Sequence, residues 1–348
     1  MRPTDQAGMS GFYNTALAKA MHTHRSEAAD GDERGGSVSH HLSEKQGPGD
    51  MYSGPIIDPH HHLWDLSMGK HPWLLPSDPT VQAIAGLEEI AHNYFPDDYS
   101  RDAKGHNVVA TVHIEALWAG DPVGETRWLE TLDKSGGVAL RYVAGAALGT
   151  DGAARTIAEQ AAFDRVTGIR GILSWHPDPK KCFVTDPELG RNAAWRRDVA
   201  LLQAHRLNLE LMMYPYQAAI VREIADSLPD LQIIINHCGS PIDRDAEGMQ
   251  RWRDGLKLIS ACPNVAIKIS NPGAYDHDWT LESIRDVAMH CLDCFGIERS
   301  MFGTDYPVSK IQMSYDQIYE TFRIIVLGLS MEDQAKLFHD NAKRFYRL

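Results

Sequence analysis

The stretch "IIDPHHHLWD", residues 56–65, decides between the two folds that the rest of the chain allows. It is a short apolar run that ends in three consecutive histidines before the chain turns apolar again. Side chains along a strand alternate between its two faces, so His60 and His62 share one face and His61 points the other way. Two imidazoles at this spacing can hold a divalent metal or flank a substrate carbonyl. We expect His61 to pack outward against a helix.

From Pro55 onward, short β-branched apolar runs alternate with helical stretches. The runs are PIIDPHHHL, NVVATVHIEAL, RYVAGAALG, VTGIRGILS, LNLELMMYP, LQIIINHCG, NVAIKIS and SMFGTDYP. This alternation predicts βα units and a parallel sheet, and eight such units match the size of a (β/α)8 TIM barrel. An open doubly wound sheet is the alternative, but it usually carries a Gly-rich phosphate loop after its first strand. Because histidines stand there instead, we predict an α/β TIM barrel over residues 55–348.

Residues 1–54 differ from the rest of the chain. They are largely polar, rich in glycine and poor in large apolar side chains, so they cannot offset the entropy lost on ordering. We expect a disordered leader there, and the sequence leaves open whether it belongs to the mature protein.

Charge and cysteine content restrict the possible partners and compartment. The chain has 34 Lys and Arg against 47 Asp and Glu, a formal charge of −13, which argues against nucleic acid or a membrane surface as partner. It lacks both an apolar run of the ~18 residues that a membrane helix needs and a secretory signal. Five irregularly spaced cysteines suit a reducing compartment. We expect a cytoplasmic protein that acts on a small molecule, with homo-oligomerisation possible.

Two further strand ends carry side chains suited to chemistry. The sixth apolar run leads to His237, and the eighth places Asp305 where the run meets a loop. Active sites of TIM barrels lie at the carboxyl ends of the strands. A carboxylate there can bind a metal, accept a proton from water, or cap the following helix. Together with the first-strand histidines, these residues predict one active site.

At this point the chain resembles the amidohydrolase superfamily, in the branch called amidohydrolase family 2. The resemblance is carried by the D-x-H-x-H of "DPHHH" and by "NHCG", "GTDYP" and "NAKRFYRL". "HLWD" followed by "HPWL" narrows it toward a lactonase-like group that includes L-fuconolactonases, 4-sulfomuconolactonase and 2-pyrone-4,6-dicarboxylate lactonase. It covers residues 55–348 and leaves the substrate open.

The resemblance implies a metal site but also exposes two gaps in it. Many relatives bind metal through residues like His60, His62 and Asp305, with a Lys or Glu on strand four and a His on strand five. Here those two strands offer Arg170 and Tyr214. Glu115 on strand two is a candidate fourth ligand, and such a set could hold zinc or manganese. Because the lactonase-like relatives include members that work without metal, both metal-dependent and metal-free catalysis remain open.

The reaction that the resemblance implies is hydrolysis of a sugar-acid or carboxylated lactone. We expect Asp305 to act as general base on water, while His60, His62 and His237 polarise the carbonyl directly or through a metal. Arg170 is the candidate for pairing with a substrate carboxylate.

Further contacts to the substrate are expected from aromatic side chains. Tyr214 is a candidate hydrogen-bond donor, and Trp64, Trp118 and Trp175 follow strand ends where they could wall a pocket or simply pack in loops.

Three other functions remain. A metal-dependent decarboxylase of the same branch would share most of the site, although Tyr214 replaces the histidine that such enzymes usually keep on strand five. An amide hydrolase would use the same parts. A barrel retained only for binding would show a broken site, whereas the strand-end histidines and the aspartate are all present.

Overall fold

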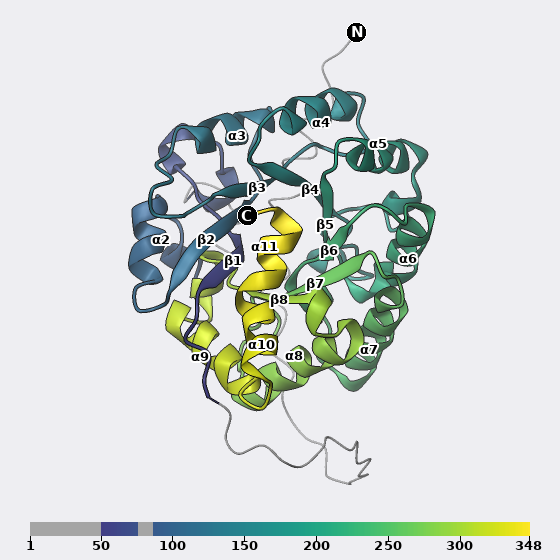
Figure 1. The fold of residues 1–348 in the computed structure, drawn as a ribbon. Helices are drawn as coiled ribbons and strands as arrows, with labels where there is room; N and C mark the ends of the chain where they lie inside the picture. Colours follow the sequence, from purple (N-terminus) through teal and green to yellow (C-terminus); the bar gives the residue numbers. More distant parts are fainter. Residues whose placement is uncertain (1–49, 76–85) are drawn as a thin grey trace.

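The computed structural model describes residues 50–75 and 86–348 and shows eight parallel strands in sequential order around a barrel (Figure 1). The strands are β1 Ile56–His61, β2 Val108–Ile114, β3 Arg141–Ala144, β4 Val166–Ile172, β5 Asn208–Met212, β6 Ile233–Ile235, β7 Val265–Ser270 and β8 Ser300–Gly303. Closure occurs just past the end of β8, where the Asp305 amide donates to the His60 carbonyl at 2.7 Å and the His62 amide donates to the Tyr306 carbonyl at 2.8 Å. The predicted (β/α)8 barrel is confirmed.

Helices cover the outside of the sheet (Figure 1). In the described residues they are α2 Pro96–Asp102, α3 Val123–Glu130, α4 Ala153–Ala161, α5 Ala193–Ala204, α6 Ala218–Ser227, α7 Ala246–Ser260, α8 Leu281–Phe295, α9 Tyr315–Ile325, α10 Met331–Ala335 and α11 Asn341–Tyr346. Local signals set their ends: the Thr280 hydroxyl accepts from the Ser283 amide to start α8, and Gly296, with φ of +69°, ends it. None of these helices has the length and apolar character needed to cross a membrane.

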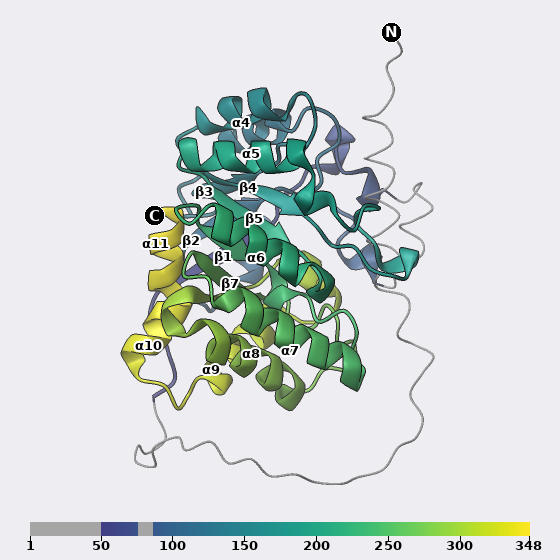
Figure 2. The ribbon, with the colours of Figure 1, turned by 90° about the vertical axis from the view of Figure 1, so that its right-hand side faces the viewer.

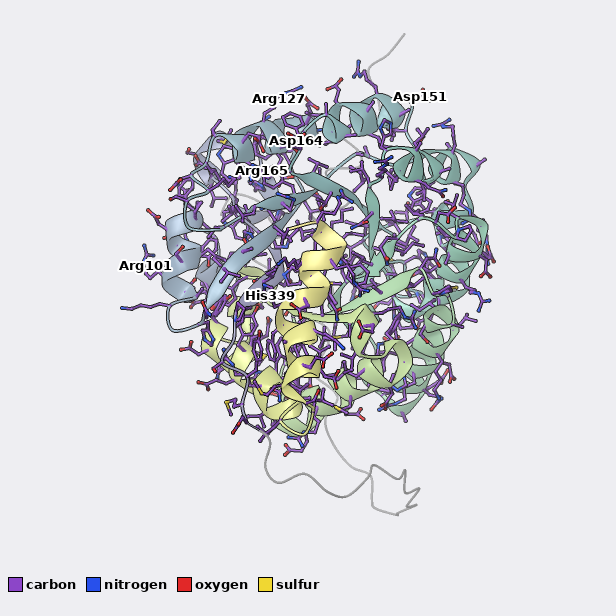
Figure 3. All side chains as sticks on the ribbon, in the orientation of Figure 1. Arg101, Arg127, Asp151, Asp164, Arg165 and His339 are labelled. Atoms are coloured by element: carbon purple, nitrogen blue, oxygen red, sulfur yellow. The ribbon has the colours of Figure 1, made fainter. Side chains whose placement is uncertain are left out.

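Charged side chains gather on the outer surface. Arg101 of α2 and Arg127 of α3 point outward (Figure 3), and their side chains are 69% and 55% exposed. The strands between these helices are mostly apolar and almost entirely buried, as parallel strands covered on both faces should be.

The amino-terminal end of the barrel is closed by α11, which lies across it (Figures 1 and 2). The Asn341 side-chain amide donates to the carbonyls of Ile297 and Ser300 at 2.6 and 2.8 Å and so fixes the start of this helix. Tyr346 packs in an apolar cluster with Ile57 at the amino ends of the strands. The carboxyl ends of the strands are therefore the open end.

The expected leader, residues 1–54, lies outside the described residues except for its last five. Within those five, Tyr52 is buried, stacks on Phe338 with ring centroids 4.9 Å apart, and donates its hydroxyl to the Pro55 carbonyl at 2.7 Å. The boundary at residue 54 stays a prediction, but the ordered packing includes Tyr52.

Candidate active site

The three histidines divide as their alternation predicts. His60 and His62 point into the open end of the barrel, where both reach Asp305. His61 is buried on the opposite face, where its Nε2 lies 2.8 Å from the Thr111 hydroxyl and its ring lies 4.8 Å from that of Tyr99 in α2. His61 thus packs outward against a helix.

Asp305 is the point at which four strand ends meet. Its Oδ1 lies 3.1 Å from His60 Nε2 and 2.9 Å from His62 Nε2, both from the first strand. Its Oδ2 accepts from the Asn271 side chain, just past β7, at 2.7 Å and lies 3.9 Å from His237 Nε2, just past β6. The structure therefore brings together all four residues that the strand ends single out.

The electrostatic state of this cluster follows from its burial. Burial alone would raise the pKa of Asp305, but His237, His60 and the hydrogen bond from His62 hold that pKa well below its ordinary value. Burial lowers the pKa of His237 to about 4 and that of His60 well below its usual value. At neutral pH the site therefore contains a carboxylate beside two neutral imidazoles.

His62 is held between a backbone carbonyl and that carboxylate. Its Nδ1 lies 2.7 Å from the Ile114 carbonyl, an oxygen that only accepts, so Nδ1 carries a hydrogen. Its Nε2 lies 2.9 Å from Asp305 Oδ1. A proton or a metal ion shared by this nitrogen and the carboxylate oxygen would keep their lone pairs from facing each other.

A pocket opens directly above Asp305 and has about 740 Å³ of empty volume, open solvent at its mouth included. Its polar lining comes from His62, Arg170, His237, Asn271 and Asp305. Its apolar lining includes Trp73, Leu117, Ile172, Phe183, Met212 and Tyr275. An apolar pocket with a few convergent polar groups is typical of a small-molecule site.

Arg170 reaches the same pocket from β4, and some of the N–H donors of its guanidinium are not used in hydrogen bonds to oxygen. Its side chain is 7% exposed, and its Nη1 donates to the Glu115 carbonyl at 2.9 Å. Its Nη2 meets only the Met212 sulfur at 3.5 Å, and its Nε has no hydrogen-bond partner among the described residues. A buried guanidinium with unpaired donors favours an anionic ligand, because a carboxylate would satisfy two donors at once.

Glu115 does not join the histidines. Its carboxylate accepts from the Leu117 amide at 2.9 Å and lies 3.5 Å from Arg170 Nη1. It lines a neighbouring hollow that also includes Trp118, on the other side of Arg170. The geometry thus gives no support to Glu115 as a fourth metal ligand.

Tyr214 also lies away from the pocket. It comes two residues after β5 ends, it is fully buried, and its hydroxyl donates to the Lys181 carbonyl at 2.9 Å. Its ring packs beside Phe183 and Met212, so Met212, not Tyr214, represents strand five at the pocket. The expected hydrogen bond from Tyr214 to a substrate has no geometric support.

The three tryptophans that the sequence singled out have different surroundings. Trp64 is fully buried and donates its indole N–H to the His92 carbonyl at 2.7 Å, which makes it a packing residue. Trp175 packs edge-on against Tyr216. Trp118 lines the hollow beside Glu115, while Trp73, which the sequence did not single out, lines the pocket above Asp305.

Two charged residues beneath the site were not anticipated. Lys268 of β7 and Glu210 of β5 are completely buried in the barrel interior, with Nζ and Oε2 2.6 Å apart. The signal was present in the sequence, because a lysine in "NVAIKIS" and a glutamate in "LNLELMM" interrupt apolar runs. Charged residues are almost never fully buried unless they are paired.

Three residues have the types and spacing of a metal site. His60, His237 and Asp305 each offer one ligand atom, and these atoms all lie within 4.8 Å of one another. Strands four and five contribute Arg170 and Met212 to this space, which are respectively a cation and a thioether. The group offers three nitrogen and oxygen ligands, His62 Nε2 also lies 2.9 Å from Asp305 Oδ1, and a guanidinium lines the same pocket.

Comparisons with known proteins place the chain among enzymes of one family. The family model described as amidohydrolase matches residues 57–348. An uncharacterised protein of Sinorhizobium fredii, y4mH, is 36% identical over 295 residues, which cover 84% of this chain and 98% of that protein. An L-fucono-1,5-lactonase of Burkholderia multivorans is 27% identical over 308 residues, which cover 84% of this chain and 96% of that protein.

Solved structures of amidohydrolases share the fold of this chain. A Burkholderia multivorans amidohydrolase crystallised with bound HEPES has a TM-score of 0.71 and 25% identity, with 85% of this chain and 100% of that chain covered. A second crystal form of a Burkholderia multivorans amidohydrolase contains bound zinc, with a TM-score of 0.71, 24% identity and the same coverage.

Proposed function

This chain belongs to the amidohydrolase family and is an enzyme, and from that premise we propose that it hydrolyses a lactone ring bearing a carboxylate. The observation that carries the proposal is the juxtaposition of two features in one pocket. An ionised Asp305 stands among three histidines, and the unpaired donors of Arg170 line the same space. Hydrolysis of a lactone carbonyl requires the Asp305–histidine cluster, and a carboxylate on the substrate would pair with the Arg170 guanidinium.

Asp305 is the general base in this proposal. It takes a proton from water as the water oxygen adds to the lactone carbonyl carbon. The ring C–O bond then breaks, and Asp305 returns the proton to the departing ring oxygen, which becomes a hydroxyl group. The new carboxylic acid ionises at neutral pH, so each turnover releases one proton to solution.

Neutral histidines stabilise the oxyanion that forms on the carbonyl. His60 Nε2 is buried and has no hydrogen-bond partner among the described residues, although Asp305 Oδ1 lies only 3.1 Å away. The 3.9 Å gap between His237 Nε2 and Asp305 Oδ2 is too long for a hydrogen bond between them. A substrate that draws the N–H of His60 toward its own oxygen would also leave Asp305 less stabilised as an anion and hence more basic.

A divalent ion, zinc or manganese, is the alternative means of polarising the carbonyl. When bound it would act as a Lewis acid, with His60, His237 and Asp305 as the ligands. The fit is poor, because the Lys268 ammonium faces His60 at 3.4 Å and Arg170 lines the same pocket. We therefore assign the polarisation to histidine N–H groups and route no step through a metal.

The test is acid release from paired lactones, each with a free carboxylate or its methyl ester, with and without a strong chelator. We expect turnover of the carboxylated lactone that survives the chelator and disappears in Asp305→Asn. Arg170→Gln should lose the preference for the free acid over the ester, and Arg101→Gln is its matched control, because Arg101 is 69% exposed and pairs with Asp98 on the outer surface. Absence of turnover on every lactone, with and without added zinc or manganese, would reject the proposal and direct attention to decarboxylation.

A further inference from the structure

A buried ion pair lies directly beneath His60. Lys268 Nζ and Glu210 Oε2 are 2.6 Å apart, and neither side chain is exposed at all. Glu210 also accepts from the Asn236 side chain at 2.6 Å and contacts the Tyr346 hydroxyl. Burying two charges costs desolvation energy, and a buried ion pair often adds no net stability. We therefore expect another role for this pair.

The three protons of the Lys268 ammonium have three acceptors. They are Glu210 Oε2 at 2.6 Å, the Pro59 carbonyl at 2.8 Å and His60 Nδ1 at 3.4 Å. An ammonium group donates and cannot accept, so His60 Nδ1 must present a lone pair to it. An imidazole ring whose Nδ1 presents a lone pair carries its hydrogen on the other ring nitrogen. That hydrogen is then on Nε2, the nitrogen that faces Asp305.

We propose that Lys268 is a positioning residue that fixes His60 in the Nε2–H tautomer, and so makes His60 a hydrogen-bond donor toward Asp305 instead of a metal ligand. The proposal concerns the state of the site and does not depend on which substrate the enzyme opens.

Metal binding through His60 would have to reverse this arrangement. A metal needs the lone pair of Nε2, so the ring proton would move to Nδ1 and face an ammonium group 3.4 Å away. Metal-bound histidines ordinarily donate their second N–H to a carbonyl or carboxylate, as His62 does toward Ile114. At His60, the group that faces Nδ1 is instead the Lys268 ammonium, which can only donate a hydrogen bond and cannot accept one from an Nδ1–H.

The test removes both charges together, in the double variant Glu210→Gln/Lys268→Met, because removing one partner alone would strand a buried charge. The glutamine keeps an acceptor for the Tyr346 hydroxyl. The Asn236 side-chain oxygen, which has no partner among the described residues, can accept from the new amide after a flip of its own amide group. Lys134→Met is the matched control, because Lys134 is a half-buried lysine that donates to the Leu129 carbonyl at 2.6 Å, away from the pocket.

Two readouts follow the tautomer and the metal affinity without any turnover. Nitrogen-15 NMR of labelled histidines, with His60→Gln to assign the signals, reports which ring nitrogen carries hydrogen. Calorimetric zinc titration of chelator-treated protein, with His60→Gln to subtract zinc bound elsewhere, reports affinity. We expect Nε2–H in the wild type and in Lys134→Met, and in the double variant a mixture of tautomers with zinc affinity raised about tenfold or more.

An Nδ1–H signal for His60 in the wild type would overturn the proposal, even if the double variant failed to fold. So would a folded double variant with unchanged tautomer and unchanged zinc affinity. Because neither readout uses a lactone, failure of the lactonase assay would leave this result standing, and the reverse also holds.

Discussion

Replacing Asp305 by asparagine tests the general base with little disturbance of the backbone. Asp305 has φ of +64°, a left-handed conformation that asparagine tolerates better than most residues. The new amide oxygen can still accept from His62, and its NH2 group would face the Asn271 side chain. The Asn271 side-chain oxygen has no partner among the described residues, so a flip of that amide restores the hydrogen bond. The variant should therefore fold.

The expected loss in activity comes from removing a proton acceptor alone. General-base catalysis contributes about 10²–10⁴-fold, so kcat should fall by that factor while KM changes by less than about threefold. Acid release measured in a pH-stat gives both constants, and thermal unfolding checks the fold. The control is Asp226→Asn, because Asp226 lies on the outer face of α6, paired with Arg222. A folded Asp305→Asn enzyme with less than about tenfold loss in kcat would refute the assignment.

Three further substitutions test other parts of the site. Arg170→Gln should lower kcat/KM about 10–100-fold for a carboxylated lactone but not for its methyl ester, because a charge-assisted hydrogen bond contributes about 1.5–3 kcal/mol; steady-state kinetics on the pair measures this. Tyr214→Phe should leave KM unchanged and cost about 1 kcal/mol of stability, because the hydroxyl already donates to a backbone carbonyl, and kinetics and urea denaturation separate the two effects. Glu125 of α3 is buried with its Oε1 3.2 Å from His113 Nε2, and burial raises its pKa from 4.5 to about 7, so its contribution to stability is present below pH 4.5 and is lost as pH rises through 7. Glu125→Gln should remove that dependence, which amounts to at most about 3.5 kcal/mol at 1.4 kcal/mol per unit, as urea denaturation at several pH values would show.

Each of these predictions can fail separately. Equal losses on the acid and the ester would mean that Arg170 acts on the fold or on the reacting carbonyl. A raised KM in Tyr214→Phe would restore that residue to the substrate site. Parallel pH profiles for wild type and Glu125→Gln would mean that Glu125 is ionised throughout the range.

The sequence predicted which side chains gather around Asp305 because strand ends are the easiest positions in a barrel to locate. Apolar runs mark the strands, and the alternation of side chains then sorts His60 and His62 from His61. The same reasoning placed His237 and Asp305 at the open end, where the structure brings them together. These inferences need only local pattern and the general rule for this fold.

The sequence failed where the outcome depended on geometry beyond a strand. Tyr214 was expected at the pocket, but β5 ends at Met212, and alternation cannot be extended into the turn that follows. Glu115 was expected near the histidines, but it lies beside Arg170. The pairing of Lys268 with Glu210 joins two strands that are not neighbours, so it depends on barrel closure and register, which no single stretch of sequence specifies.

The contact between Tyr346 and Glu210 has a consequence for how the protein is made. Tyr346 follows Glu210 by 136 residues, so the glutamate leaves the ribosome long before the hydroxyl that contacts it. Until α11 emerges, the apolar side chains of Ile57, Ile234 and Met301 at the end of the barrel also lack their cover. Completion of this barrel must therefore wait until α11 has been synthesised. Removal of Tyr346 and the residues after it should expose the apolar ends of the strands and destabilise the whole barrel, not yield a folded but weaker enzyme.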